Sequence, residues 1–344
     1  MGEKLLSIII PSYNTSRYID STLPSILEHE YNNLLEIIII NDGSTDATKE
    51  KAERFYKLYP DVVKVVNKEN GGHGSGINRG IQEARGHFFK VIDGDDYVET
   101  RELIRFLNQI KNIDADVIIS PYTTVSAMTS VEKIMMPTNF RFVKKENGIE
   151  YNRLYDSDNI LPYIYGTIHA ITYKTSLLKE HFSDVKVSEK IFYEDNEYCL
   201  FPMAFVNKVY LSDCNVYRYV IDQANQSVSS ENRKKRIDHQ IMVMENILIH
   251  YKKLFLNNSS EVTKDYAYRV IGRHVYSIFE TYMLFNDNAL KRRIELKNID
   301  QKIKRECRDV YLEANIYPVV KMMRLSNYFL YRIIRRYLQK RWNK

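Results

Sequence analysis

Residues 5 to 14 are Leu-Leu-Ser-Ile-Ile-Ile-Pro-Ser-Tyr-Asn, an apolar run that Pro11 stops and a polar turn follows. A continuous run of this kind is typical of a strand that is buried on both faces. Similar runs occur at 34–40, 62–66 and 88–92, and segments with helical spacing of apolar residues separate them. Strands that alternate with helices in this way predict an α/β fold with a doubly wound, mostly parallel sheet.

Polar residues follow each of these four runs at the point where the predicted strand ends. The clusters are Ser12 to Asn14, Asp42 to Ser44, Asn70 to His73, and Asp93 to Asp96. Ligands of doubly wound sheets bind beyond the carboxyl ends of the strands. The sequence therefore predicts a binding site at this edge of the sheet.

The fourth cluster concentrates negative charge, because Asp93, Asp95 and Asp96 lie within four positions. Three carboxylates so close together repel one another unless a cation lies among them, and a divalent metal is the usual one. The alternative is a solvated acidic turn that Gly94 helps to close. The nucleotide-binding pattern upstream favours the metal, and we expect Mn²⁺ or Mg²⁺.

Four ordered motifs carry a resemblance to a known family. Residues 7–14, 40–46 and 93–96, followed by the acidic segment 192–198, resemble family 2 glycosyltransferases of the GT-A fold over roughly residues 5 to 230. The resemblance implies inverting transfer of a sugar from a nucleotide diphosphate sugar, with a UDP-sugar expected, to an acceptor hydroxyl. One departure is that Ile77 stands where the family often has an arginine; Arg79 lies two residues further on.

The resemblance and the chemistry of the leaving diphosphate together suggest roles on the donor side. Asp95 is the first choice as metal ligand, with Asp93 as its partner near the metal or the ribose, and Asp96 is expected to orient its neighbours or touch the donor sugar. Asp42 is expected to accept the imide N–H of uracil, or else to cap a helix that begins near Thr45. The remaining residues predicted to contact the nucleotide sugar are Pro11, Tyr13, Asn14, Asn78 and Arg79.

An inverting transfer needs a general base opposite the diphosphate. The resemblance selects Asp195, with Glu194 as the fallback base or as a group that holds the acceptor. The structural alternative is that both acids complement the N-terminus of a helix. His73 is expected either to contact a phosphate or sugar or to be merely exposed. Arg218, Lys235 and Arg236 follow the base and are candidates to supply positive charge near the diphosphate.

The length of 344 residues indicates two units, which we predict as a GT-A domain at 1–230 and a helical region at 231–344. Short helices are expected at 146–156 and 174–182, with a strand at 168–173 between them. Three scattered cysteines fit neither a zinc site nor a disulfide framework. The chain lacks a signal-peptide pattern and a 20-residue apolar run, which favours a cytoplasmic location.

The C-terminal segment is strongly basic. Residues 301 to 344 contain 12 Lys and Arg against 3 Asp and Glu, and no acid follows Glu313. Apolar and aromatic residues interleave with these cations from 317 onward, as in a peripheral anchor to anionic membrane at the inner face of the cell membrane. The alternative is a helix docked on the protein's own core. If the segment is an anchor, truncation near residue 315 should leave a soluble protein. No motif supports nucleic-acid binding.

Two functions remain open at this stage. The favoured one is a bacterial-type transferase that builds a cell-surface polysaccharide or teichoic acid on a lipid-linked or glycan acceptor. The alternative is a non-catalytic partner subunit that binds a nucleotide sugar. A nucleotidyltransferase would share the sheet, but such enzymes usually carry a Gly-rich, Arg-containing loop where this chain has residues 11–14.

Overall fold

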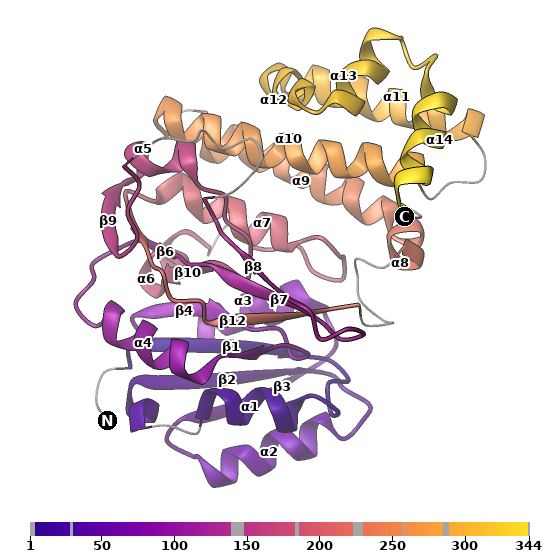
Figure 1. Cartoon of the computed structure of the whole chain (residues 1–344). Helices are drawn as coiled ribbons and strands as arrows, with labels where there is room; N and C mark the ends of the chain where they lie inside the picture. The colour runs from indigo at the N-terminus through magenta and orange to yellow at the C-terminus, as the bar shows by residue number, and fades with distance from the viewer. Residues whose placement is uncertain are drawn as a thin grey trace. The chain divides into compact units, whose positions relative to one another are not determined.

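The structure is a computed structural model that describes residues 4–27, 30–138, 148–182, 186–222, 230–256, 259–284 and 289–342. The chain divides into two compact units, Met1–Gln223 and Ala224–Lys344. The first unit contains the sheets, and the second is helical (Figure 1).

The first unit is built on an eight-stranded mixed sheet. Its strands, in spatial order, are β3 (Val63–Lys68), β2 (Leu35–Asp42), β1 (Leu6–Ser12), β4 (Phe88–Val91), β10 (Ile171–Lys174), β6 (Val117–Ile119), β11 (Lys208–Leu211) and β9 (Arg153–Asp156). The first four are parallel, β10 runs antiparallel to both of its neighbours, and β9 runs antiparallel to β11. All seven residues of β1 are buried, as expected of a central strand covered on both faces.

Helices cover both faces of the parallel part of the sheet (Figure 1). Alternate residues Leu6, Ile8 and Ile10 of β1 share one apolar core with residues of α1 (Ile19–Leu27), α2 (Thr48–Leu58) and α4 (Thr100–Ile110). Ile9 points the other way, toward α3 (His73–Glu83), where Gly80 allows the helix to approach closely. This arrangement is the predicted doubly wound fold.

A second sheet of four strands ties the acidic loop to a distant part of the chain. Its order is β5 (Tyr97–Val98), β12 (Tyr217–Ile221), β7 (Tyr122–Ser126) and β8 (Glu132–Met135). Because β5 directly follows Asp96 and pairs with Tyr217 and Arg218, the loop between β4 and β5 is held against β12. The unit is completed by α5 (Ser157–Ile160), α6 (Thr175–His181), α7 (Asp195–Leu200) and the 3-10 turns at Glu30–Leu34, Leu161–Tyr163 and Phe201–Phe205.

The second unit consists of helices packed around α10. Its elements are α8 (Ser230–Lys235), α9 (Ile237–Leu254), α10 (Glu261–Leu284), α11 (Ala289–Glu306), α12 (Arg308–Glu313), a 3-10 turn (Ala314–Ile316), α13 (Pro318–Leu325) and α14 (Tyr331–Trp342). Among the described residues, none of the helices combines the length and apolar character needed to cross a bilayer. Val320, Met323, Tyr328, Tyr331 and Ile334 are buried. Docking of the C-terminal segment is therefore confirmed, while membrane contact stays a prediction.

Several predicted elements are wrong in type or position. In 148–156, the described part of the helix expected at 146–156, no helix forms. Residues 153–156 are β9, an edge strand whose mostly exposed residues show no strand pattern in the sequence. The helix expected near Thr45 begins at Thr48, because Asp46 rather than Asp42 accepts the backbone N–H of Thr48. The sequence favours one Gly-rich turn of Gly71, Gly72, Gly74 and Gly76 before the next helix, but Gly74 and Gly76 lie inside α3. The predicted domain boundary rests on the polar segment 225–230, interpreted as a loop. Residues 225–229 lie outside the described residues, and Ser230 begins α8.

Candidate active site

The acidic loop after β4 is anchored through Asp96. This carboxylate is 2% exposed, accepts a hydrogen bond from Tyr217 Oη at 2.7 Å and accepts another from the backbone N–H of Val220 at 2.8 Å. The same Tyr217 hydroxyl accepts the backbone N–H of Asp93 at 3.1 Å. Asp96 thus orients the loop, which was one of its two expected roles.

Burial and mutual repulsion disfavour the charged forms of Asp95 and Asp96. Burial also raises the pKa of Asp93, but the hydrogen bond and charge of His73 outweigh it and hold that pKa below its usual value. Burial and the charge of Asp93 raise the pKa of Asp95 to about 6. Burial, with the charges of Asp93 and Asp95, also raises the pKa of Asp96 well above its usual value. A cation near this loop would relieve the repulsion.

His73, the first residue of α3, bridges the two acidic motifs. Its Nε2 lies 3.0 Å from Asp93 Oδ1, and its Nδ1 lies 2.8 Å from Glu194 Oε1. Burial lowers the pKa of His73, but the hydrogen bonds and charges of Asp93 and Glu194 outweigh it and hold the pKa well above its usual value. The imidazolium form donates at both nitrogens, as this geometry requires. His73 is therefore not merely exposed: it contacts Glu194, which lies 121 positions further along the chain, as well as Asp93.

Asp195 begins α7 directly after the buried Glu194. Burial and the charge of Glu194 raise its pKa to about 7. A carboxyl group with a pKa near neutrality is suited to take a proton from a hydroxyl group. Asp195 and Glu194 also lie at the N-terminus of α7, as the structural alternative requires. Acids at this place complement the positive end of the helix, and the same position is compatible with catalysis.

His169 is a site residue that the sequence analysis missed. Its ring stacks on Tyr219 at a centroid distance of 4.1 Å, and its buried Nδ1 has no hydrogen-bond partner among the described residues. The backbone carbonyl of His169 accepts a bond from the buried Lys90 Nζ at 2.9 Å. Burial, with Lys90 nearby, lowers the pKa of His169 to about 4, so the ring is neutral and has a lone pair to offer.

These groups fit a divalent metal. In the part of the chain that the structure describes, Asp93, Asp96 and His169 each offer a ligand atom within 4.8 Å of the others. The buried Nδ1 of His169, which has no hydrogen-bond partner among the described residues, and the raised pKa of Asp96 both fit a cation at this place. Asp95 does not belong to this group, so its predicted role as first ligand stays a prediction.

Asp42 holds in place the Gly-rich turn before α3, which contains Gly71 and Gly72. Its buried carboxylate accepts the backbone N–H groups of Gly71 and Gly72 at 2.9 and 2.7 Å and a bond from Lys68 Nζ at 2.6 Å. It does not cap α2, so that alternative is wrong. Ser75 Oγ lies 3.4 Å from the same carboxylate, so four groups of the chain surround it, and the contact of Asp42 with uracil stays a prediction.

The other predicted donor contacts have different surroundings. Tyr13 presents a ring that is 52% exposed, whereas Pro11 is buried against Gly76. Asn14 accepts the backbone N–H of Thr45 at 2.8 Å and so supports the loop before α2. Arg79 is exposed and forms an ion pair with Glu83 one turn along α3. It is not among the residues that the structure brings to Asp93 or Glu194.

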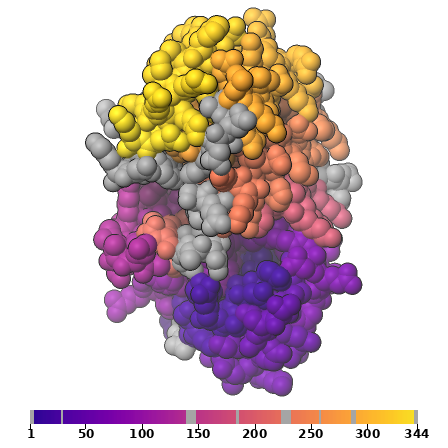
Figure 2. All heavy atoms as spheres, turned by 90° about the vertical axis from the view of Figure 1, so that its right-hand side faces the viewer, coloured from indigo at the N-terminus to yellow at the C-terminus, as the bar shows by residue number. Residues whose placement is uncertain are grey.

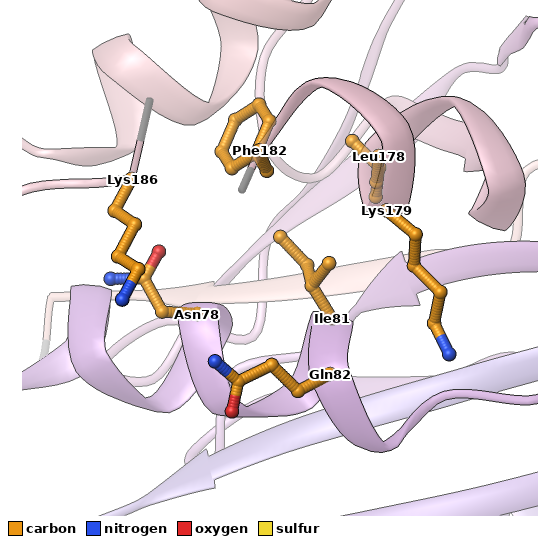
Figure 3. Close-up of a pocket in the computed structure, with 7 residues that line it drawn as sticks. All are labelled: Asn78, Ile81, Gln82, Leu178, Lys179, Phe182 and Lys186. Carbon is orange, nitrogen blue, oxygen red and sulfur yellow. The ribbon is translucent and has the colours of Figure 1, made fainter. Parts of the chain in front are cut away.

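Asn78 connects α3 to the segment that leads into the acidic pair. Its side chain bonds the backbone N–H and carbonyl of Val187 at 3.0 and 2.8 Å. It also lines a cavity of about 320 Å³ between α3 and α6, shown in Figure 3. The remaining lining residues are Ile81, Gln82, Leu178, Lys179, Phe182 and Lys186. None of these lining residues is acidic, so the cavity does not include the carboxylates that would carry the chemistry.

Three cations that follow Asp195 in the sequence were predicted to lie near the diphosphate. One of them, Arg218, lies in the first unit and donates to the backbone carbonyl of Asn215 at 2.7 Å. Lys235 and Arg236 belong to the second unit. The predicted contact of these cations with the diphosphate stays a prediction.

The fold and the convergence of acidic groups define a glycosyltransferase of the GT-A fold. A family model described as "Glycosyl transferase family 2" matches residues 7–181, slightly more than half of the chain. The chain belongs to this family.

Curated relatives of the chain are also described as glycosyltransferases. An uncharacterized glycosyltransferase of Rickettsia felis is 27% identical over 242 residues, which cover 67% of this chain and 36% of that protein. Glycosyltransferase GlyG of Streptococcus pneumoniae is 36% identical over 120 residues, which cover 35% of this chain and 39% of that protein. The chain thus spans little more than a third of the length of these curated relatives.

Solved structures with low sequence identity share the fold. Residues 1–349 of S. aureus TarS match with a TM-score of 0.65 at 19% identity, covering 98% of this chain and 91% of that chain. The mannosyltransferase PcManGT from Pyrobaculum calidifontis matches with a TM-score of 0.51 at 14% identity, covering 94% of this chain and 88% of that chain. At such identities the likeness concerns the fold alone.

Proposed function

We propose that the chain transfers a sugar with inversion from a nucleotide diphosphate sugar, specifically a UDP-sugar, to an acceptor hydroxyl. One observation carries the proposal: in a family 2 chain, His73 joins the acidic loop at 93–96 to the acidic pair at 194–195. This brings a group suited to hold the diphosphate and a group suited to remove a proton into one site.

Asp195 is the proposed general base. It takes the proton of the acceptor hydroxyl while the acceptor oxygen bonds to the anomeric carbon. The bond from that carbon to the phosphate oxygen breaks at the same time, and its electron pair leaves with the nucleoside diphosphate. Glu194, held by His73, is the fallback base or a contact to the acceptor.

The donor side is assigned to the edge of the parallel sheet. Asp93, Asp96 and His169 would hold Mn²⁺ or Mg²⁺, with Asp95 as a further candidate. When bound, the ion would stabilise the negative charge that develops on the leaving diphosphate. TarS is solved with UDP-GlcNAc and with UDP, and PcManGT with GDP-Man and Mn²⁺, which supports a nucleotide-sugar donor for this chain as well.

Base recognition is assigned to residues nearer the N-terminus. The exposed ring of Tyr13 offers a stacking face for the base, and Asp42 is the proposed acceptor of its imide N–H, which would replace or share one of the present donors to this carboxylate. Pro11, which packs against Gly76, and Asn14, which accepts the backbone N–H of Thr45, flank this part of the site.

The acceptor is proposed to be a lipid-linked or cell-surface glycan precursor, and the protein is proposed to lie at the inner face of the membrane as a peripheral protein. The basic C-terminal segment supports a membrane location, because it combines cations with exposed apolar side chains. A role in building polysaccharide or teichoic acid would follow from such an acceptor.

A thermal-shift screen of UDP-, GDP- and dTDP-sugars with Mn²⁺ tests the donor. A UDP-sugar should raise the melting temperature, and the shift should vanish in EDTA and in Asp95→Ala. Turnover of the stabilising donor then separates an enzyme from a non-catalytic partner subunit, which would bind without transfer or hydrolysis. Full activity in EDTA would remove the metal from the mechanism.

A further inference from the structure

The helices α13 and α14 and the turn between them expose large apolar side chains although both helices are docked. The exposed fractions are 78% for Leu325, 76% for Phe329, 65% for Ile333 and 61% for Tyr337. Met322 is also exposed, at 47%. Together with the exposed cations Lys321, Arg332, Arg336 and Lys340, these residues form what is called here the C-terminal stripe. In Figure 2 the yellow atoms of these helices lie at the surface of the helical unit.

The stripe is distinct from the face that docks α14. Tyr331, Ile334 and Leu338 recur at helical spacing and are buried, and Tyr331 Oη donates to the backbone carbonyl of Tyr282 on α10 at 2.7 Å. Ile333 and Tyr337 lie one turn apart on the opposite side of the helix, next to Arg332 and Arg336. Because α14 is already anchored by its buried face, its apolar outer face is not needed to hold the helix in place.

Among the described residues, the exposed cations of the C-terminal stripe form no ion pair with a carboxylate. Arg324 is neutralised internally, since it forms a buried ion pair with Asp300. No acidic residue follows Glu313 in the sequence, so the exposed cations of the stripe have no acid on their own helices. A surface that presents apolar and cationic groups together is complementary to one class of partner: a bilayer with anionic headgroups, which accepts both.

We propose that the C-terminal stripe is the surface through which the protein binds an anionic lipid bilayer, with Leu325, Phe329, Ile333 and Tyr337 entering the headgroup region and the cations contacting lipid phosphates. A second copy of the chain is a poorer occupant, because its stripe carries the same positive charge. Nucleic acid would neutralise the cations but leave the apolar side chains in water. The inference specifies the surface for the membrane contact proposed above, and it does not depend on the proposed reaction.

Co-sedimentation with vesicles tests the surface. The full-length protein should bind vesicles of equal parts phosphatidylcholine and phosphatidylglycerol, should bind phosphatidylcholine vesicles much less, and should be released by high salt. Arg332→Gln/Arg336→Gln/Lys340→Gln should weaken binding by about 100-fold, at about fivefold per cation. Phe329→Ser/Ile333→Ser should weaken it by about tenfold or more.

A matched control is available on α9 of the same unit. Met242 and Ile249 are 52% and 65% exposed, so Met242→Ser/Ile249→Ser removes similar exposed apolar area at another place. This control should bind vesicles like the wild type, and unchanged melting temperatures should show that all variants fold. Equal vesicle binding by stripe and control variants would overturn the proposal. So would a stripe variant that only changes the oligomeric state. UDP binding, measured in the same variants, reports separately on the proposed function.

Discussion

Asp195 is the side chain whose protonation decides whether the proposed reaction can proceed. Its pKa is raised to about 7, by burial and by the charge of Glu194. A general base acts only when it is deprotonated, so kcat/KM should rise with pH up to about 7 and level off above it. Initial rates at saturating metal, measured from acidic pH to above neutrality, follow this rise of kcat/KM with pH. A rate that is flat through neutrality would contradict the assignment.

Replacement of Asp195 by Asn preserves size but removes the proton acceptor. We expect turnover to fall by about 10² to 10⁴-fold, the usual contribution of a general base, while UDP binding by calorimetry stays unchanged. Glu194→Gln is the matched control, since it alters the neighbouring carboxylate and leaves Asp195 in place. If Glu194→Gln lost turnover while Asp195→Asn kept it, the two roles would have to be exchanged.

Removal of the charge on His73 should shift the same pH profile. The cation near Asp195 partly offsets the causes that raise its pKa, so His73→Gln should move the acidic limb to higher pH and lower kcat/KM at neutral pH. His87→Gln changes an exposed histidine of the same unit and should leave the profile where it is. A profile of His73→Gln that coincides with the wild type would show that the bridge has no electrostatic role.

The carboxylates of the site could be predicted from the sequence because they lie in short motifs at strand or helix ends. His73 and His169 could not be assigned in this way. His73 contacts Asp93 and Glu194 only after α3 and α7 have come together, and His169 meets Asp93 through the antiparallel insertion of β10 beside β4. A histidine that directly follows two glycines at a strand end was the available signal for His73.

At the scale of elements, the close approach of α3 to the segment before α7 depends on Gly74. A Cβ at this position would lie 2.1 Å from the carbonyl oxygen of Ser188 and 2.9 Å from Glu194 Cγ, so one of the two segments would have to move. We expect Gly74→Ala to lower turnover strongly by displacing the acidic pair. The measurement is kcat together with the melting temperature.

Gly272→Ala is the control for this prediction. Gly272 lies inside α10, where a Cβ would find its nearest neighbour at an ordinary 3.5 Å. The substitution should stabilise the protein by up to about 1 kcal/mol, because alanine favours a helix more than glycine does, and should not affect turnover. Full activity of Gly74→Ala would mean that the segment at 187–190 adjusts without moving the site.

The elements that could be predicted are those whose pattern reflects complete burial. β1 and β2 are continuous apolar runs because both of their faces are covered. β9 could not be predicted, since an edge strand with exposed residues is stabilised by pairing with β11 rather than by its own apolar pattern. The start of α2 was predicted near Thr45 but lies at Thr48. Asp42 is engaged by the backbone N–H of the distant Gly71, and Asp46 accepts the backbone N–H of Thr48 instead.

At the scale of the whole molecule, the docked C-terminal segment changes the expected result of truncation. Removal of residues after 315 would uncover Tyr282 and the other α10 residues that contact α14, and it would leave Asp300 without Arg324. We therefore expect the truncated protein to lose the melting transition of its helical unit, contrary to the expectation from the sequence. A truncated protein that retains this transition, measured by calorimetry, would show that the segment is dispensable.

The Asp300–Arg324 pair allows a sharper test of the helical unit. Asp300 is fully buried and accepts bonds from Arg324 and from Tyr328 Oη at 2.6 Å. Arg324→Met leaves this carboxylate without its cation, which should destabilise the unit by about 3–5 kcal/mol. Lys321→Met, an exposed cation one turn earlier, should change stability by less than about 0.5 kcal/mol. The double variant Asp300→Leu/Arg324→Met should recover much of the loss, because apolar residues often replace a buried ion pair without cost. If the double variant were as unstable as Arg324→Met, the loss would come from the packing of Arg324 on Tyr311 rather than from an unpaired charge.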